Sequence, residues 1–219
     1  MQSPPAKPLF VTFEGIDGSG KSTHLSRAVE WLESRGHRFR FTKEPGGTDL
    51  GNAIRAVFLD PQWGKMDGRV EAMLVFGSRR QNLVELIEPA LAAGEHVICD
   101  RFTDSSLAYQ GVRDETPPEW IAELDELVTG GKRPDHTLLF DLDPATAVTR
   151  GRSTKRQEAG DVDRLDVLEM EFYQRVRATY HGLVEREPDR FHVIDSGGEK
   201  EATWQQVEAI LEKLFGGPA

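Results

Sequence analysis

A glycine-rich segment that follows a short apolar run constrains the fold of this chain more than any other feature. The apolar run is Leu9-Phe10-Val11-Thr12-Phe13, and the segment is Gly15-Ile16-Asp17-Gly18-Ser19-Gly20-Lys21-Ser22. The segment fits G-x-x-x-x-G-K-[ST], which is typical of a phosphate-binding loop between a strand and a helix. Glycines let backbone N–H groups surround phosphate oxygens, the lysine reaches the β- and γ-phosphates, and the serine hydroxyl ligates magnesium. A turn that serves only packing is the alternative, but the Lys-Ser pair and the flanking elements favour nucleotide binding.

The rest of the chain alternates short β-rich runs with longer helical patterns, as α/β proteins with a covered parallel sheet do. Strands are predicted at Leu9–Glu14, Arg38–Thr42, His96–Asp100, Thr137–Asp141 and Phe191–Ile194. Helices are predicted at Lys21–Ser34, Leu50–Leu59, Arg69–Ala92, Pro117–Val128, Ala145–Arg150, Leu165–Glu185 and Ala202–Leu214. This order predicts a three-layer P-loop NTPase-like fold, with a five-stranded parallel sheet between helices, as a single domain over residues 9–215.

Composition limits the partners and the compartment. Asp and Glu number 37 against 27 Lys and Arg, and the net charge of −10 opposes binding to nucleic acid or to an anionic membrane. Cys99 is the only cysteine, so the chain has no internal disulfide, which fits a reducing cytosol. Residues 1–8 lack the apolar stretch of a signal peptide, and no segment approaches the roughly 20 apolar residues that span a bilayer. We therefore expect a flexible leader on a soluble cytoplasmic protein.

One polar segment breaks the alternation of strands and helices. Residues 151–164 contain almost no apolar anchor and are bracketed by predicted helices. Such a segment is either an ordinary solvated loop or a lid that closes over a bound nucleotide. Phosphoryl transfer gains from cationic groups that close over the phosphates and expel water, so the phosphate-binding loop favours the lid.

Polar residues follow several of the predicted strands. In an open parallel sheet, ligands bind beyond the carboxyl ends of the strands, so these residues share one rim. Asp100 ends an apolar strand, where phosphate-loop proteins place the acid that holds magnesium. Arg101 follows with a planar guanidinium suited to bidentate capture of a phosphate. The turn Lys43-Glu44-Pro45-Gly46-Gly47-Thr48 follows another strand, although Pro-Gly-Gly is strong turn chemistry by itself.

Together these motifs resemble those of the thymidylate kinase family. The matching segments, in the family's order, are Phe13-Glu14-Gly15-Ile16-Asp17-Gly18-Ser19-Gly20-Lys21-Ser22-Thr23, Glu44-Pro45-Gly46-Gly47-Thr48, Asp100-Arg101-Phe102-Thr103-Asp104-Ser105-Ser106-Leu107-Ala108-Tyr109-Gln110-Gly111 and Arg133-Pro134-Asp135. The resemblance runs from about Leu9 to the C-terminal helix, so it is more specific than the phosphate-binding loop alone. It implies magnesium-dependent transfer of the ATP γ-phosphate to dTMP, giving dTDP and ADP, by a protein that is usually a homodimer.

The resemblance implies which residues hold the donor nucleotide. ATP is expected to contact Gly15, Ile16, Asp17, Gly18, Ser19, Gly20, Lys21, Ser22, Thr23 and Arg150. Lys21 is expected to act in catalysis together with Asp100 and Arg101. Magnesium is expected at Ser22 and Asp100.

The resemblance also implies residues for the acceptor phosphate and its neighbourhood. Arg101 and Arg55 would clamp the dTMP phosphate, although Arg55 taken alone is more simply a solvated helix charge. Asp17, Glu44 and Pro45 are expected beside the substrate. The acceptor is already an anion, so no base is needed, and the task is to offset repulsion between two polyanions.

Gly18 sharpens the expected mechanism. Some thymidylate kinases carry a basic residue at this position and others supply it from the lid, and this chain resembles the second, bacterial-type group. The cations for the transition state are then expected among Arg150, Arg152, Lys155, Arg156 and Arg164. We assign catalysis to Arg152 and Arg156, which lie in the least regular stretch, and one such arginine can change the rate by orders of magnitude.

The thymine pocket is the place where the chain departs from the family pattern. The family has a phenylalanine four residues before an arginine, whereas the match places Arg79 at the arginine position and Val75, not Phe76, at the phenylalanine position. One possibility is that the pattern is shifted by one residue, so that Phe76 stacks on thymine and Arg80 is the arginine four residues later. The other is that a different residue forms the surface on which thymine stacks. A phenylalanine on an apolar helix face most often belongs to the hydrophobic core, so Phe76 has a structural interpretation as well. Further pocket candidates are Ser105, Ser106, Tyr109 and Gln110.

Two other functions remain as alternatives at this point. The first is a kinase for another nucleoside monophosphate or a deoxynucleoside on the same fold, against which the Glu44–Thr48 and Asp104–Gly111 segments argue. The second is a regulatory P-loop ATPase, which would need a hydrolytic water and no cationic clamp for a second phosphate.

Overall fold

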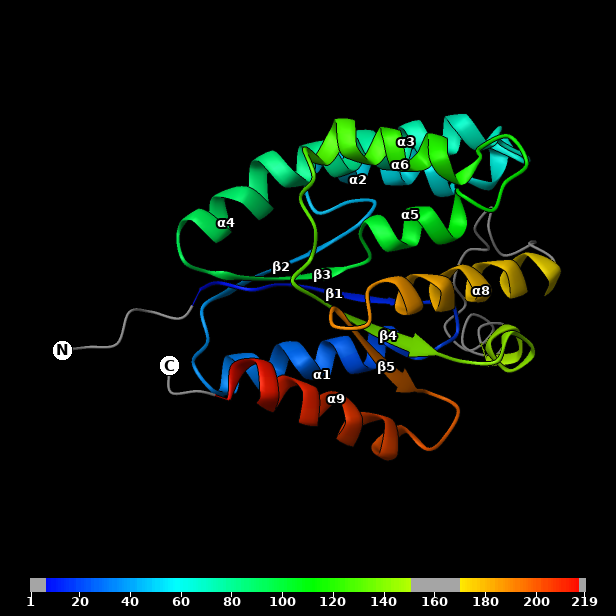
Figure 1. The fold of residues 1–219 in the computed structure, drawn as a ribbon. Coiled ribbons are helices and arrows are strands. Elements are labelled where there is room, and N and C mark those ends of the chain that lie inside the picture. The colour runs from blue at the N-terminus through cyan, green and yellow to red at the C-terminus, as the bar shows by residue number, and fades with distance from the viewer. Residues whose placement is uncertain (1–6, 151–169, 217–219) are drawn as a thin grey trace.

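The central layer of the molecule is a five-stranded sheet in the order β2-β3-β1-β4-β5, in which every neighbouring pair is parallel (Figure 1). The structure is a computed structural model, and it describes residues 7–150 and 170–216. The strands are β1 (Phe10–Gly15), β2 (Phe39–Lys43), β3 (His96–Asp100), β4 (His136–Asp141) and β5 (Phe191–Asp195). The predicted five-stranded parallel sheet is confirmed, and each strand end lies within one residue of its predicted position.

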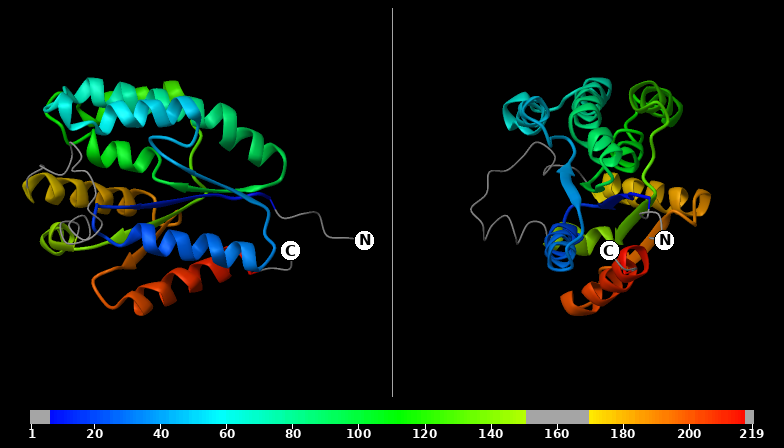
Figure 2. Two further views of the ribbon diagram at one scale, coloured as in Figure 1. Left: turned by 180° about the vertical axis from the view of Figure 1, so that it is seen from behind. Right: turned by 90° about the vertical axis from the view of Figure 1, so that its left-hand side faces the viewer.

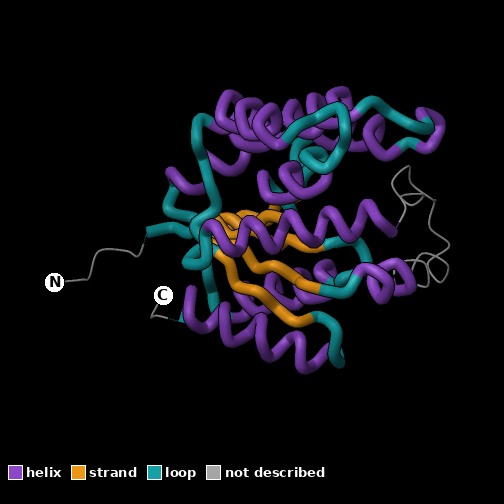
Figure 3. The backbone as a smooth tube through the Cα atoms, turned by 45° about the vertical axis from the view of Figure 1, so that its right-hand side comes forward, coloured by secondary structure: helices purple, strands orange, loops and turns teal. Residues whose placement is uncertain are grey.

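Helices cover both faces of the sheet, which gives the predicted three layers (Figures 2 and 3). One face carries α1 (Lys21–Ser34) and α9 (Lys200–Phe215). The helices on the other side are α2 (Asp49–Leu59), α3 (Gly68–Asn82), α4 (Glu88–Ala92), α5 (Thr103–Tyr109), α6 (Pro118–Thr129) and α8 (Met170–Arg186), with a 3₁₀ turn at Pro61–Trp63. Residues 144–150 are also helical, as predicted.

The core follows from the alternation of side chains along the buried strands. In β1, Val11 and Phe13 are fully buried and pack in the layer of α1 and α9. Phe10 points to the opposite face, where it packs with Leu83 and Ile87. Every residue of β1 is buried, as expected for a central strand of a parallel sheet. The phosphate-binding loop therefore follows directly after a fully buried central strand.

The predicted single helix over Arg69–Ala92 is divided by a π-helical segment. That segment, Leu83–Ile87, lies between α3 and α4 and contains no glycine or proline of its own. Pro89 follows it, and a proline has no N–H to donate and its ring clashes with the carbonyl four residues earlier. A local widening of the helix accommodates such a residue without ending the helix.

The short helix α5 was not predicted. Its sequence, Thr103-Asp104-Ser105-Ser106-Leu107-Ala108-Tyr109, is rich in residues that compete with helical hydrogen bonds. Six of its seven residues are buried, so tertiary contacts hold the helix in place. Among the described residues, no helix is long and apolar enough to cross a bilayer.

Candidate active site

The phosphate-binding loop joins the end of β1 to the first turn of α1, as predicted. The Ser19 N–H donates to the Ile16 carbonyl at 3.1 Å, which closes the turn. Gly18 has a φ of +84°, and a Cβ atom there would lie 2.1 Å from the carbonyl oxygen of Ala147. The backbone of residues 144–150 thus occupies the space that a side chain at position 18 would need. This contact gives a physical reason for glycine at position 18.

Lys21 and Asp100 form an ion pair at the rim of the sheet. Burial lowers the pKa of Lys21, and the charge of Arg101 lowers it further. Burial raises the pKa of Asp100, but the charges of Lys21 and Arg101 outweigh it, so that the pKa lies below its usual range. Asp100 is therefore ionised at neutral pH, and the ammonium of Lys21 is held where a phosphate would arrive.

The residues expected at magnesium offer donors that suit this ion. Ser22 is exposed in the first turn of α1, and the Oδ2 atom of Asp100 makes no hydrogen bond with the described residues. Magnesium prefers oxygen ligands and is commonly held by one or two carboxylates together with substrate phosphates. Among the described residues, no group of three or more His, Cys, Asp and Glu could hold a metal.

Arg101 brings together three other residues from the predicted site. Its guanidinium donates to Asp17 Oδ1 at 2.7 Å and to Ser105 Oγ at 3.0 Å. It also lies over the ring of Tyr109, 5.0 Å from the centroid. The side chain of Arg101 is 17% exposed, so the group remains accessible from the rim. The four residues come from the phosphate-binding loop, the end of β3 and helix α5.

A second cluster joins the turn after β2 to helices α3 and α5. Arg79 Nε donates to Glu44 Oε2 at 2.7 Å, and its NH2 group donates to Ser106 Oγ at 2.9 Å. Asn82 Nδ2 donates to the other oxygen of Glu44 at 3.0 Å. The Arg79 and Glu44 side chains are each 1% exposed. Burial raises the pKa of Glu44, and the charge of Arg79 opposes this rise.

Phe76 lies beneath Arg79 in the core. Its ring is 4.6 Å from the Arg79 guanidinium and packs with Ala72 and Ile121. Arg80 points elsewhere, toward the Val128 carbonyl at 3.3 Å, so it does not pair with Phe76. The thymine-stacking role of Phe76 stays a prediction, and it would require this ring to leave its packed position because it is 1% exposed.

The remaining acceptor candidates lie around the same rim. Arg55 donates to the Pro45 carbonyl at 3.0 Å, which fixes helix α2 against the Glu44–Thr48 turn. Gln110 is buried at the end of α5, and its side-chain amide makes no hydrogen bond with the described residues. The turn is tied to α3, where the Gly46 N–H donates to Ser78 Oγ at 2.8 Å.

Arg150 connects the helix at 144–150 with the loop after β5. Its guanidinium donates to the Ser196 carbonyl at 2.8 Å and to the Gly197 carbonyl at 3.0 Å. The other expected lid cations lie outside the described residues: Arg152, Lys155, Arg156 and Arg164. The predicted lid itself, residues 151–164, lies outside the described residues as well.

Two residues with polar contacts at the site were not assigned a role from sequence. Glu14 is fully buried at the end of β1, and Tyr180 of α8 donates to it at 2.8 Å. An acidic residue inside an otherwise apolar strand is unusual and was the available signal for Glu14. Nothing in the helical pattern distinguishes Tyr180 from an ordinary core residue.

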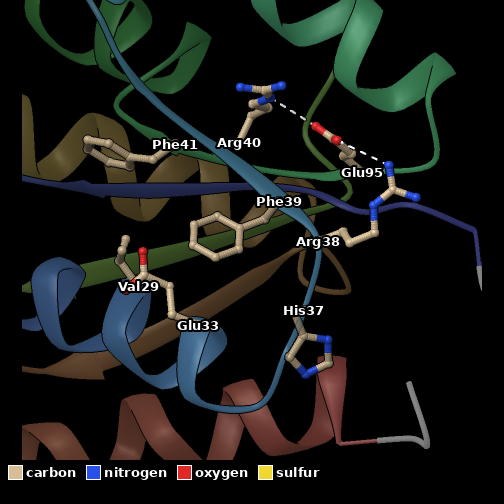
Figure 4. A pocket seen from close by; sticks show the side chains of 8 residues that line it. All are labelled: Val29, Glu33, His37, Arg38, Phe39, Arg40, Phe41 and Glu95. Atoms are coloured by element: carbon tan, nitrogen blue, oxygen red, sulfur yellow. Dashed lines mark hydrogen bonds and ion pairs between the residues drawn. The ribbon is translucent and has the colours of Figure 1, made fainter.

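A separate hollow lies at the opposite end of the sheet, where β2 and β3 begin (Figure 4). Arg38 and Arg40 both form ion pairs with Glu95 there, at 3.2 and 2.9 Å. Their charges therefore have partners, and the hollow is at the amino end of β2 rather than the carboxyl end. Ligands of open parallel sheets bind at the carboxyl end, which is the end that carries the phosphate-binding loop.

Comparison with known proteins agrees with this geometry. The family model for thymidylate kinase matches residues 13–207. A thymidylate kinase of Paraburkholderia phytofirmans is 47% identical over 214 residues, which cover 96% of this chain and 98% of that protein. One of Solidesulfovibrio magneticus is 42% identical over 210 residues, which cover 94% of this chain and all of that protein.

A solved structure supports the same assignment. The crystal structure of thymidylate kinase from Ehrlichia chaffeensis is 32% identical, with a TM-score of 0.74. The match covers 94% of this chain and 99% of that one. The chain belongs to the thymidylate kinase family.

Proposed function

We propose that this protein transfers the γ-phosphate of ATP to dTMP, giving dTDP and ADP, as a step toward dTTP. The arrangement of Lys21, Asp100 and Arg101 carries the proposal. Lys21, which is suited to bind the donor phosphates, pairs with Asp100 at the end of β3. Arg101, which is suited to bind an acceptor phosphate, is the next residue. Such positioning is most of what phosphoryl transfer to an existing phosphate anion requires, because no proton must be removed from a hydroxyl.

Arg101 and Arg55 would bind the dTMP phosphate, with Asp17, Ser105 and Tyr109 around the sugar. The two arginines reduce the repulsion between the acceptor anion and the triphosphate. Tyr109 lies against Arg101, so it can limit the space beside the sugar. In this arrangement, the acceptor oxygen approaches the γ-phosphate from the side opposite the leaving group.

Base recognition would involve Arg79, Ser106 and Gln110, with Phe76 as the support beneath Arg79. The NH1 group of Arg79 makes no hydrogen bond with the described residues, and its nearest carboxylate oxygen, on Asp125, is 3.6 Å away. A buried donor without a partner costs free energy, which a base carbonyl would recover. The Arg79 side chain is 1% exposed, so this contact requires a shift of the side chains that cover it.

Magnesium bound by Ser22 and Asp100 would neutralise charge on the β- and γ-phosphates. Lys21 orients the same phosphates, and the loop from Gly15 to Thr23 surrounds them with N–H groups. Arg152 and Arg156 would supply the remaining positive charge from the lid. Arg150 would hold the loop at Ser196 and Gly197 near the adenine.

A homodimer in the cytoplasm is the form in which we expect the protein to act. Helices α2 and α3 pack together and expose large apolar side chains, which include Leu50 at 53%, Val57 at 45%, Val70 at 42% and Met73 at 54%. An apolar group of this kind is typical of an interaction surface. Sedimentation velocity tests the proposal: the wild type should sediment as a dimer, and Met73→Glu should shift it toward the monomer.

An ADP-release assay with ATP and a panel of nucleoside monophosphates tests the proposed activity. We expect clear preference for dTMP and dependence on magnesium. Equal turnover of another monophosphate would favour a kinase with a different acceptor. ADP release without any acceptor would favour a regulatory ATPase.

A further inference from the structure

Glu14 is a buried acid at the end of β1, directly before the phosphate-binding loop. Its carboxylate accepts three hydrogen bonds: from the Phe102 N–H at 2.7 Å, from Ser105 Oγ at 2.5 Å and from Tyr180 Oη at 2.8 Å. No lysine or arginine among the described residues forms an ion pair with it. A buried acid without a paired cation is costly, so its contacts need an explanation beyond packing.

The raised pKa of Glu14 reflects the free-energy cost of ionising this buried acid. Burial, followed by the charge of Asp104, raises the pKa of Glu14 to about 7, and the charge of Arg101 opposes the rise. Tyr180 faces the carboxylate from α8, and Lys21 lies close enough for its own pKa to respond to Glu14. A solvated surface acid would carry none of this penalty.

The hydrogen bond from the Phe102 N–H to Glu14 holds the backbone next to Arg101, which has an unusual conformation. Arg101 has a φ of +69°, and it is the only residue other than glycine with a positive φ in the described part of the chain. Residues with side chains rarely adopt this conformation, and it persists only where neighbouring contacts determine it. The Arg101 N–H donates to the Phe13 carbonyl at 3.0 Å, and the next N–H, that of Phe102, donates to Glu14.

The side chain of Arg101 depends on Glu14 as well. Ser105 Oγ accepts from the guanidinium at 3.0 Å while it donates to Glu14 at 2.5 Å. The carboxylate therefore determines which way the Ser105 hydroxyl points and keeps its lone pair available to Arg101. Tyr180, 3.0 Å from Ser105 Oγ, closes this group from the side of α8.

We propose that Glu14 is a positioning residue that fixes the backbone and the guanidinium of Arg101 in the orientation that binds the acceptor phosphate. The proposal rests on the function proposed above for Arg101. Glu14 touches neither substrate; it acts through the Phe102 N–H and the Ser105 hydroxyl. Glu14 belongs to β1, the strand that leads into the phosphate-binding loop. Its carboxylate therefore connects that strand to Arg101, the residue proposed to bind the acceptor.

The test uses steady-state kinetics of Glu14→Gln at about pH 8, where the carboxyl of Glu14 is mostly ionised because its pKa, raised to about 7, lies below this pH. The substitution keeps the side-chain size and replaces one acceptor oxygen with a donor. The amide opposes the hydroxyls of Ser105 and Tyr180, so the KM for dTMP should rise about tenfold while the KM for ATP changes less than about twofold. The matched control is Glu71→Gln, the same change at a buried acid on α3 that accepts from Arg113 at 3.3 and 3.2 Å. This control should leave both KM values within about twofold, whatever stability it loses.

A double-mutant cycle with Arg101→Ala separates this proposal from the function it rests on. If Glu14 acts through Arg101, Glu14→Gln adds no further change once Arg101 is alanine. Additive effects, or equal changes in both KM values, would overturn the positioning role. If Arg101→Ala leaves dTMP use unchanged, the acceptor clamp itself is wrong and the positioning role falls with it.

A second variant covers the case in which Glu14→Gln does not fold. Tyr180→Phe removes one donor to Glu14 and leaves the contacts of Arg101 intact. We expect the KM for dTMP to rise about two- to threefold, because one of the bonds that orient the carboxylate is lost. An unchanged KM for dTMP in this variant would contradict the proposal.

Discussion

The proposed donor and acceptor halves of the site are built in different ways. The donor half is mainly backbone: a glycine-rich loop, the start of α1 with Ser22 and Thr23 exposed, and the main chain of residues 144–150 against Gly18. The acceptor half consists of buried charged side chains, chief among them the Glu44–Arg79 pair. A triphosphate offers many oxygens to N–H groups, whereas one small acceptor must be placed by a few fixed side chains. Substitutions should therefore affect the two halves differently.

The largest effect is expected from Lys21→Met in the donor half. Loss of the ammonium should lower kcat about 10³-fold, because its charge acts where negative charge develops during transfer. Binding of dTMP, measured by isothermal titration calorimetry, should change less than about twofold. Lys213→Met, at an exposed lysine near the end of α9, is the control and should keep nearly full activity. A kcat loss of similar size in both variants would contradict the role of Lys21.

Glu44→Gln should have its main effect on stability. It removes the charge opposite Arg79, and breaking a buried pair typically costs about 3–5 kcal/mol, so we expect about 3 kcal/mol from urea unfolding. The control is Glu201→Gln, whose pair with Arg27 is 66% and 38% exposed, and it should cost less than about 1 kcal/mol. An equal loss of unfolding free energy in the two variants would contradict the larger contribution expected from the buried pair.

Arg101→Ala should affect the acceptor half alone. We expect kcat/KM for dTMP to fall about 10²-fold and the KM for ATP to stay within about twofold. Arg80→Ala provides a control, because Arg80 is 53% exposed and contacts α6 rather than the rim. Equal loss of affinity for ATP and dTMP would show that Arg101 serves both halves.

The smallest effect should appear in the pH dependence of stability. Burial raises the pKa of Glu14 to about 7, so between its unfolded value and pH 7 the folded protein holds a proton that the unfolded chain has lost. Stability from this group therefore falls as pH rises, by about 2 kcal/mol between pH 5.5 and 7.5. The measurement is the free energy of unfolding of wild type minus that of Glu14→Gln at both pH values. A difference that does not change with pH would contradict the raised pKa.

The sequence predicted the sheet and the rim because both depend on local patterns. Apolar runs mark the strands, and polar residues directly after them, such as Asp100 and Arg101, must lie at one edge of a parallel sheet. Helix α5 was missed because tertiary burial, not propensity, forms it. The π-helical segment before Pro89 was missed because a periodic pattern does not reveal a change in helix type.

The contacts within the site could be predicted only in part. Sequence placed Asp17, Ser105 and Tyr109 near Arg101 through the family resemblance, but not their mutual hydrogen bonds. The link from Glu14 to Tyr180 joins positions 166 residues apart and follows from tertiary packing alone. Whether Phe76 meets the base depends on movement of packed side chains, which no spacing rule describes.

Hydrogen exchange measured by NMR tests most directly whether the acceptor half is formed before substrate binds. The Phe102 and Gly46 N–H groups donate to buried side chains, Glu14 and Ser78, at 2.7 and 2.8 Å. We predict that both amides exchange slowly in the free protein and that dTMP slows them less than about tenfold, whereas a non-hydrolysable ATP analogue strongly slows the amides of Ser22 and Thr23. Fast exchange of Phe102 and Gly46 in the free protein, with protection only after dTMP binds, would contradict a preformed acceptor half.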